Sequence, residues 1–218
     1  MTSIRLTICG EGPNDEALVP IVARLVERHL PAVPVEREWA DWRLKHDPRP
    51  TTLAEKIAAA IELFPCDLLA VHQDADRLDR VARASQITTA VAGLDSDVPF
   101  ICVVPVRTLE AWLLCDELAI RHAAGNPNGR AKLDLPLHRQ IERLADPKAR
   151  LRAALTAAGD QRRRRQQNVG ASDVYKRLAD RIEDIAPLLQ LSAFATLEAE
   201  VKTFAELWTA ANPPDGAA

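Results

Sequence analysis

Four acidic side chains follow short apolar segments in the first half of the chain, and carboxylates in such positions can bind a cation or move a proton. Glu11 follows the first segment, the pair Asp74 and Asp76 follows the third, and Glu110 follows the fourth. If these segments are parallel strands, their carboxyl ends meet at one edge of a sheet, where ligands bind in such folds. We therefore expect the four acids to share one site.

The spacing of these acids favours a metal site. Asp74 and Asp76 point to the same side of an extended chain, where their charges repel. A divalent cation neutralises that charge, and oxygen-only ligands favour Mg²⁺ or Mn²⁺ over zinc. Such ions activate water and stabilise charge on a phosphodiester, and in a two-metal site they stand about 3.5–4 Å apart. Any one acid alone is more often a helix cap or a solvated loop residue, so the prediction depends on several acids meeting.

The elements that must position the acids alternate along the first half of the chain. Apolar patterns predict strands over residues 4–9, 33–39, 68–72 and 100–106, with helices between them and a short helix over 108–114. Thr51 or Thr52 can cap the second helix, and Thr108 can cap the short one. Pro34 places the second strand at an edge of the sheet. The alternation predicts an α/β fold, a Rossmann-like parallel sheet flanked by helices.

The second half of the chain has a helical pattern only. Helices are expected over residues 136–145, 147–158, 172–185 and 192–211. We therefore predict an α/β domain over 1–120, a helical C-terminal region over 121–211 packed on it or beside it, and a tail over 212–218.

Composition excludes several classes of protein. The chain has 218 residues, of which 27% are charged and 47% hydrophobic, as is typical of globular proteins. No apolar run approaches the roughly 20 residues of a membrane helix, and no secretory pattern opens the sequence. The four cysteines lack metal-binding spacing, which is typical of a reduced cytoplasmic protein. We therefore expect a cytoplasmic protein that does not associate with membranes.

Charge is divided unevenly between the two halves. Residues 1–120 hold 12 Lys and Arg against 19 Asp and Glu, whereas residues 121–218 hold 16 against 12. The basic half includes Lys148 and four consecutive arginines, which are Arg162, Arg163, Arg164 and Arg165. Such a segment either follows a phosphate backbone and releases counterions or is a solvated loop.

Other α/β sites fit the sequence less well. Gly10-Glu-Gly12 begins like a dinucleotide-binding loop, but Glu11 would repel a pyrophosphate. A receiver domain needs a lysine after the last strand, where this chain has Arg107, and a dehalogenase-type D-x-D would follow the first strand.

The acidic motifs resemble the Toprim domain, the metal-binding fold of topoisomerases, primases and OLD-family nucleases. That family carries a glutamate after its first strand and a D-x-D after its third, which here are Glu11 within CGEGPNDE and Asp74 and Asp76 within VHQDADR. A group of mostly uncharacterised bacterial Toprim-like proteins has a segment similar to VPVRTLEAWLLCDE, and DPKARL at 146–151 matches that group more loosely. The resemblance spans residues 3–205.

The resemblance implies Mg²⁺-dependent cleavage of phosphodiester bonds in DNA or RNA. It implies that Asp74 and Asp76 bind the metal, that Glu11 is a metal ligand or general acid–base, and that Glu110 completes the site. It also implies a role in bacterial anti-phage defence beside an SMC/ABC-type ATPase. Because the only tyrosine, Tyr175, falls in the helical half, DNA strand passage is not expected.

Three functions remain open from the sequence. The leading hypothesis is a nuclease that uses Mg²⁺ or Mn²⁺ and holds nucleic acid through Lys148 and the arginine run. The second is a non-catalytic or partner-activated effector that works with an ATPase, and the third is an enzyme that acts on small phosphates. The sequence also leaves open whether the substrate is DNA or RNA and whether the chain forms a homo-oligomer.

Overall fold

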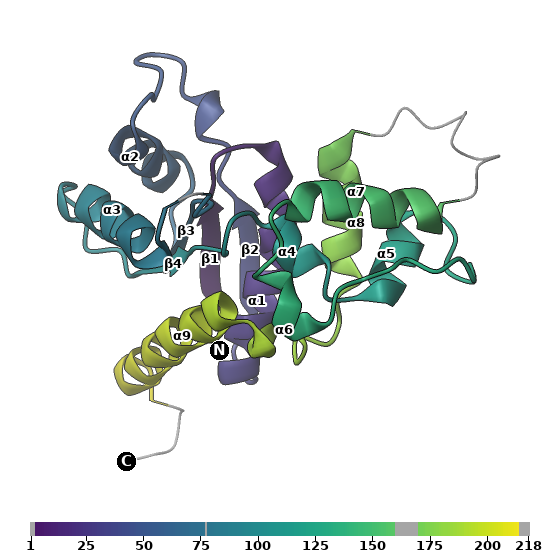
Figure 1. Cartoon of the computed structure of the whole chain (residues 1–218). Coiled ribbons are helices and arrows are strands. Elements are labelled where there is room, and N and C mark those ends of the chain that lie inside the picture. Colours follow the sequence, from purple (N-terminus) through teal and green to yellow (C-terminus); the bar gives the residue numbers. More distant parts are fainter. Residues whose placement is uncertain (1–2, 77, 160–169, 214–218) are drawn as a thin grey trace.

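A four-stranded parallel sheet lies at the centre of the computed structural model, which describes residues 3–76, 78–159 and 170–213 (Figure 1). Its strands are β1 (Ile4–Cys9), β2 (Val35–Trp39), β3 (Leu68–His72) and β4 (Phe100–Val103). They lie in the order β2-β1-β3-β4, and each neighbouring pair is parallel. The α/β prediction is therefore confirmed, and β2 lies at an edge of the sheet.

Helices connect the strands and cover both faces of the sheet. They are η1 (Pro13–Ala17) and α1 (Leu18–His29) after β1, η2 (Trp42–Leu44) and α2 (Leu53–Leu63) after β2, α3 (Arg80–Ala92) after β3, and α4 (Glu110–Leu113) after β4. One core cluster packs α2 and α3 against one face, and a larger cluster joins α1 and α4 to the other face. Figure 1 shows α2 and α3 together on one side of the sheet.

The second half of the chain adds α5 (Glu117–Ala123), α6 (His138–Ile141), α7 (Pro147–Ala158), α8 (Ala171–Asp180), η4 (Leu188–Gln190) and α9 (Ser192–Ala211). Buried residues of α5, α7, α8 and α9 belong to the same core cluster as β1 and α1. Helix α8 packs against η1, and α9 packs against α1 and β4. In the described part of the chain, every helix is too short or too polar to cross a membrane.

Strand side chains alternate between the two cores, as the pleat requires. Leu6 and Ile8 of β1 face the larger cluster, whereas Leu69 and Val71 of β3 face the smaller one. All five residues of β3 are buried, because the strand is covered on both faces.

Local capping explains where two helices begin. The Thr52 side chain accepts from the Glu55 amide, and the Glu55 carboxylate accepts from the Thr52 amide, which forms a capping box at α2. The expectation for Thr108 is wrong. Its hydroxyl is buried without a partner among the described residues, and the Leu109 amide donates instead to Asp74 Oδ1 at 2.9 Å. A carboxylate from the loop after β3 thus accepts a hydrogen bond from a backbone amide at the start of α4.

Three expected elements are shorter in the structure. Strand β4 ends at Val103 rather than at residue 106, and Pro105 beyond it has no amide to donate to a neighbouring strand. The helix expected over 136–145 contains only His138–Ile141, and the helix expected over 172–185 is Ala171–Asp180.

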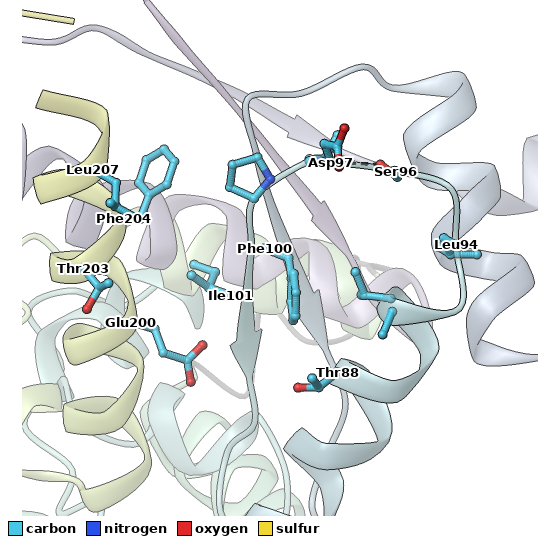
Figure 2. Close-up of a pocket in the computed structure, with 14 residues that line it drawn as sticks. Thr88, Leu94, Ser96, Asp97, Phe100, Ile101, Glu200, Thr203, Phe204 and Leu207 are labelled. Atoms are coloured by element: carbon cyan, nitrogen blue, oxygen red, sulfur yellow. Dashed lines mark hydrogen bonds between the residues drawn. The ribbon is translucent and has the colours of Figure 1, made fainter. Parts of the chain in front are cut away.

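The outer edge of β4 faces α9. The Glu200 carboxylate of α9 accepts from the Cys102 amide at 2.7 Å, so one free donor of this edge is satisfied. Beside it lies a largely apolar cavity of about 600 Å³. Figure 2 shows Phe204 and Leu207 of α9 on one side and Leu94 on the other. The cavity lies near the amino end of β4, away from the carboxyl ends of the strands.

Candidate metal centre

Glu11, His72 and Asp74 converge where β1 and β3 end. One ligand atom from each side chain lies within 4.8 Å of the others. The adjacent strands β1 and β3 pair Cys9 with Val71, so the residues that follow them leave the sheet side by side. Because the chain runs from β1 outward to β2 and from β3 outward to β4, the two strands flank the topological switch point of the sheet. Ligands of open parallel sheets bind at this point.

His72, the last residue of β3, is the most enclosed member of the cluster. Its side chain has no exposed surface, and its Nδ1 lies 2.9 Å from the Val103 carbonyl oxygen. Its Nε2 lies 3.4 Å from Asp74 Oδ1 and 3.7 Å from Asp15 Oδ1, and has no hydrogen-bond partner among the described residues. Burial lowers the pKa of His72, but the carboxylates of Asp74 and Asp15 outweigh burial and raise it to about 9. The ring therefore occupies a strongly negative position.

Asp15 builds the turn that holds Glu11. Its buried carboxylate accepts from the Glu11 amide at 2.7 Å and from the Gly12 amide at 3.0 Å. Gly10 makes this arrangement possible, because a Cβ there would lie 2.8 Å from Asp15 and from the Trp39 ring. Asp15 is not among the four acids predicted from the sequence, because no local pattern reveals that its side chain faces His72.

Glu11 lies at the exposed mouth of the cluster. Loss of part of its water shell raises the pKa of Glu11, and the nearby carboxylates of Asp74 and Asp15 raise it further, while His72 acts in the opposite direction. The Glu11 carboxyl therefore combines contact with solvent and a position beside two other carboxylates.

Asp76 lies outside the cluster of ligand atoms. Its φ of 53° is left-handed, so the alternation of an extended chain does not hold across Asp74 and Asp76. The Asp76 side chain is 62% exposed, 3.9 Å from Arg83 Nη2. Its amide donates to the carbonyl of Arg107, whose φ of 65° is also left-handed, and both residues line a neighbouring polar cavity of about 440 Å³.

Glu110 belongs to a second group of polar side chains. It is 3% exposed, and Lys148 Nζ of α7 lies 3.8 Å from its Oε1. Burial raises the pKa of the Tyr175 phenol, Glu110 raises it further, and Arg152 lowers it. The structure therefore brings Glu110 close to Lys148 and Tyr175. Asp74 is linked to the start of the same helix, because it accepts a hydrogen bond from the amide of Leu109, the residue before Glu110.

The structure describes only one of the basic residues that the sequence analysis proposed for nucleic-acid binding. Lys148 is half-exposed beside Glu110. Arg162, Arg163, Arg164 and Arg165 lie outside the described residues.

The three clustered side chains fit a divalent cation. Two carboxylates supply charge, and the buried, unpartnered Nε2 supplies a third donor aimed at them. The sequence predicted oxygen ligands only, whereas the cluster in the structure offers two carboxylate oxygens and one imidazole nitrogen. A histidine directly at the end of β3, two residues before Asp74, was the available signal for it.

Comparisons of the chain with protein-family models, with curated proteins and with solved structures found no match.

Proposed function

We propose that this chain is a divalent-metal-dependent phosphodiester hydrolase that cleaves DNA or RNA, a function that the Toprim resemblance of its motifs implies. The observation that carries the proposal is the cluster of Glu11, His72 and Asp74 at the switch point of a parallel sheet.

The acidic residues of the site have proposed roles. Glu11 and Asp74 hold the cation, which when bound lowers the pKa of a coordinated water and stabilises charge on a phosphate. For Glu11 the resemblance also implies a role as general acid–base, and its exposed position at the mouth of the cluster lets its carboxylate reach an attacking water. Asp15 keeps the turn of Glu11 in place, and Asp74 is held by the Leu109 amide. These fixed positions reduce the reorganisation that catalysis would need.

The nucleic acid would lie along the carboxyl edge of the sheet. Lys148 presents a half-exposed ammonium group beside Glu110 and would contact a phosphate there. We propose that Arg162 to Arg165 also contact the phosphate backbone of the nucleic acid, because four consecutive arginines carry a high positive charge. The four cysteines are all free, which fits the cytoplasmic location that we also propose.

Cleavage assays with matched variants test this function. Purified protein with Mg²⁺ or Mn²⁺ should nick plasmid DNA or cut RNA, and Asp74→Asn should lose this activity. Asparagine retains an oxygen for the Leu109 amide, so the variant should stay folded. Asp95→Asn removes the same charge from an exposed residue before β4 and should cut normally. Equal cutting by wild type and Asp74→Asn would indicate a contaminating nuclease and contradict the proposal.

A second candidate is a partner-activated effector, and the placement of Asp76 favours it. The D-x-D pair is not assembled on one cation here, because Asp76 points toward Arg83 and lines a separate cavity. In this function the SMC/ABC-type ATPase that the resemblance implies would bind and complete the site. The expected result is metal binding without cleavage by the chain alone, and cleavage once a co-purified ATPase from the native host is added. Full cleavage by the isolated chain would exclude this candidate.

A further inference from the structure

We infer that His72 is itself a metal ligand, through Nε2, and that the centre therefore takes a first-row transition-metal ion such as Mn²⁺ in preference to Mg²⁺. This inference rests on the proposed function only in assuming that a cation binds at the cluster. It goes further in naming a nitrogen ligand and the class of metal that the ligand selects.

The orientation of the ring carries the first step. Nδ1 lies 2.9 Å from the Val103 carbonyl oxygen, and a carbonyl can only accept, so Nδ1 carries the hydrogen. Val103 is also the residue that pairs with His72 in the β3–β4 ladder, so the strand register holds the ring in place. Histidines that bind metals commonly donate one ring N–H to a backbone carbonyl in this way, which directs the second nitrogen toward the metal. The proton that Nε2 carries in the metal-free protein would be released to solvent when the metal binds.

The surroundings of Nε2 carry the second step. This atom is fully buried, has no hydrogen-bond partner among the described residues, and faces oxygens of Asp74 and Asp15 at 3.4 and 3.7 Å. Those distances are too long for a short charge-assisted hydrogen bond, which measures about 2.7–2.9 Å. Donor atoms bound to one ion at about 2.0–2.2 Å lie roughly 4 Å or less apart. The three ligand atoms within 4.8 Å therefore need only a small inward movement to share an ion.

The chemistry of the donors carries the third step. Mg²⁺ prefers oxygen ligands in near-ideal octahedral geometry, whereas imidazole suits first-row metals such as Fe²⁺ and Zn²⁺. Mn²⁺ belongs to the same row, suits carboxylates, and serves as the paramagnetic probe of the site. A site with Glu11, Asp74 and one imidazole therefore favours Mn²⁺ over Mg²⁺. If His72 instead served only as an ion-pair partner of the two aspartates, the bound cation would have oxygen ligands alone.

Pulsed electron paramagnetic resonance on the Mn²⁺-loaded full chain distinguishes these alternatives without any activity measurement. We expect a ¹⁴N coupling to Mn²⁺ in the wild type, converted to a ¹⁵N coupling when only the histidines are labelled with ¹⁵N. His72→Asn keeps a donor for the Val103 carbonyl but lacks Nε2, so it should lose the coupling. His122→Asn, on the exposed side of α5, should keep it.

Metal competition gives a second measurement. His72→Gln places an amide oxygen near the position of Nε2, so it should weaken Mn²⁺ binding by about 10-fold or more and leave Mg²⁺ binding nearly unchanged. Both affinities are measured by calorimetry, and circular dichroism checks that the variant is folded.

The outcomes separate the inference from the proposed function. Mn²⁺ that binds the wild type without a histidine nitrogen coupling overturns the inference and leaves a metal-dependent hydrolase standing. A histidine coupling in a protein that cleaves no nucleic acid supports the inference and counts against the hydrolase. Failure of the wild type to bind Mn²⁺ overturns the inference, and failure to bind Mg²⁺ as well overturns the proposed function. If His72→Asn fails to fold, the wild-type spectra still show whether a histidine binds the metal, and the spectrum of His72→Gln assigns that histidine.

Discussion

Removing the Asp15 carboxylate should destabilise the turn that holds Glu11. Its Oδ2 accepts two backbone amides, from Glu11 at 2.7 Å and from Gly12 at 3.0 Å, and the side chain is buried. Each donor left unpaired costs about 1–3 kcal/mol, with the lower half of that range appropriate because both contacts are partly exposed. Asp15→Ala should therefore lower the free energy of unfolding by about 2–4 kcal/mol, or the melting temperature by about 5–15 °C.

Asp15→Asn is the matched variant that separates hydrogen bonding from charge. Its amide oxygen can accept the same two backbone amides, while its NH₂ group faces His72 in place of the second carboxylate oxygen. The hydrogen bonds become neutral and weaker, so we expect a loss of about 1 kcal/mol.

Urea unfolding followed by circular dichroism at pH 7 with a chelator measures both changes. The chelator matters because a bound cation would add its own stabilisation to the wild type. Equal losses for the two variants, or a loss below about 1 kcal/mol for Asp15→Ala, would show that this carboxylate does not build the turn.

Three further predictions concern groups around the site and its scaffold. The pKa of His72 is about 9 in the folded protein, because nearby carboxylates outweigh burial, against 6.5 for the free side chain. Protonation therefore stabilises the metal-free fold fully below about pH 6.5, and unfolding in urea should become easier as the pH rises toward 9, with a flatter profile in His72→Asn. Glu142 accepts from the Ser192 hydroxyl and from the first amides of α9, so Glu142→Ala should cost about 1–2 kcal/mol in the same assay; no loss would mean that the cap is dispensable. Gly10→Ala should cost about 1–3 kcal/mol through its 2.8 Å contacts, whereas Gly12→Ala, with open space around it, should be nearly neutral, and the reverse order would contradict the geometry.

The sheet could be predicted because its signals are local. Apolar runs bounded by turn residues gave all four strands, and Pro34 placed β2 at an edge. The Thr52 cap of α2 also depends on residues three positions apart, so it was visible in the sequence.

What could not be predicted depends on contacts between distant segments. Thr108 does not cap α4 because Asp74, from another loop, takes the Leu109 amide. Asp76 has a left-handed backbone conformation, and its amide donates to the carbonyl of Arg107 in another loop. This conformation places the side chain of Asp76, the second acid of the D-x-D, outside the cluster.

The role of His72 was also hidden, for the same reason. A histidine at a strand end is usually a packing or hydrogen-bonding residue, and only the register with Val103 and the approach of Asp15 from η1 show where its second nitrogen points. The convergence of Glu11 and Asp74 followed from the parallel direction of the predicted strands, whose carboxyl ends share one edge. The chemistry of their third neighbour required the folded chain.

Anomalous scattering from crystals soaked in Mn²⁺ is the most direct measurement of the proposed centre. We expect one manganese peak between the ends of β1 and β3, bound by Glu11, Asp74 and His72 Nε2. A crystal with no peak at this position, or with manganese held only by acids elsewhere on the surface, would contradict the existence of a metal centre at the switch point.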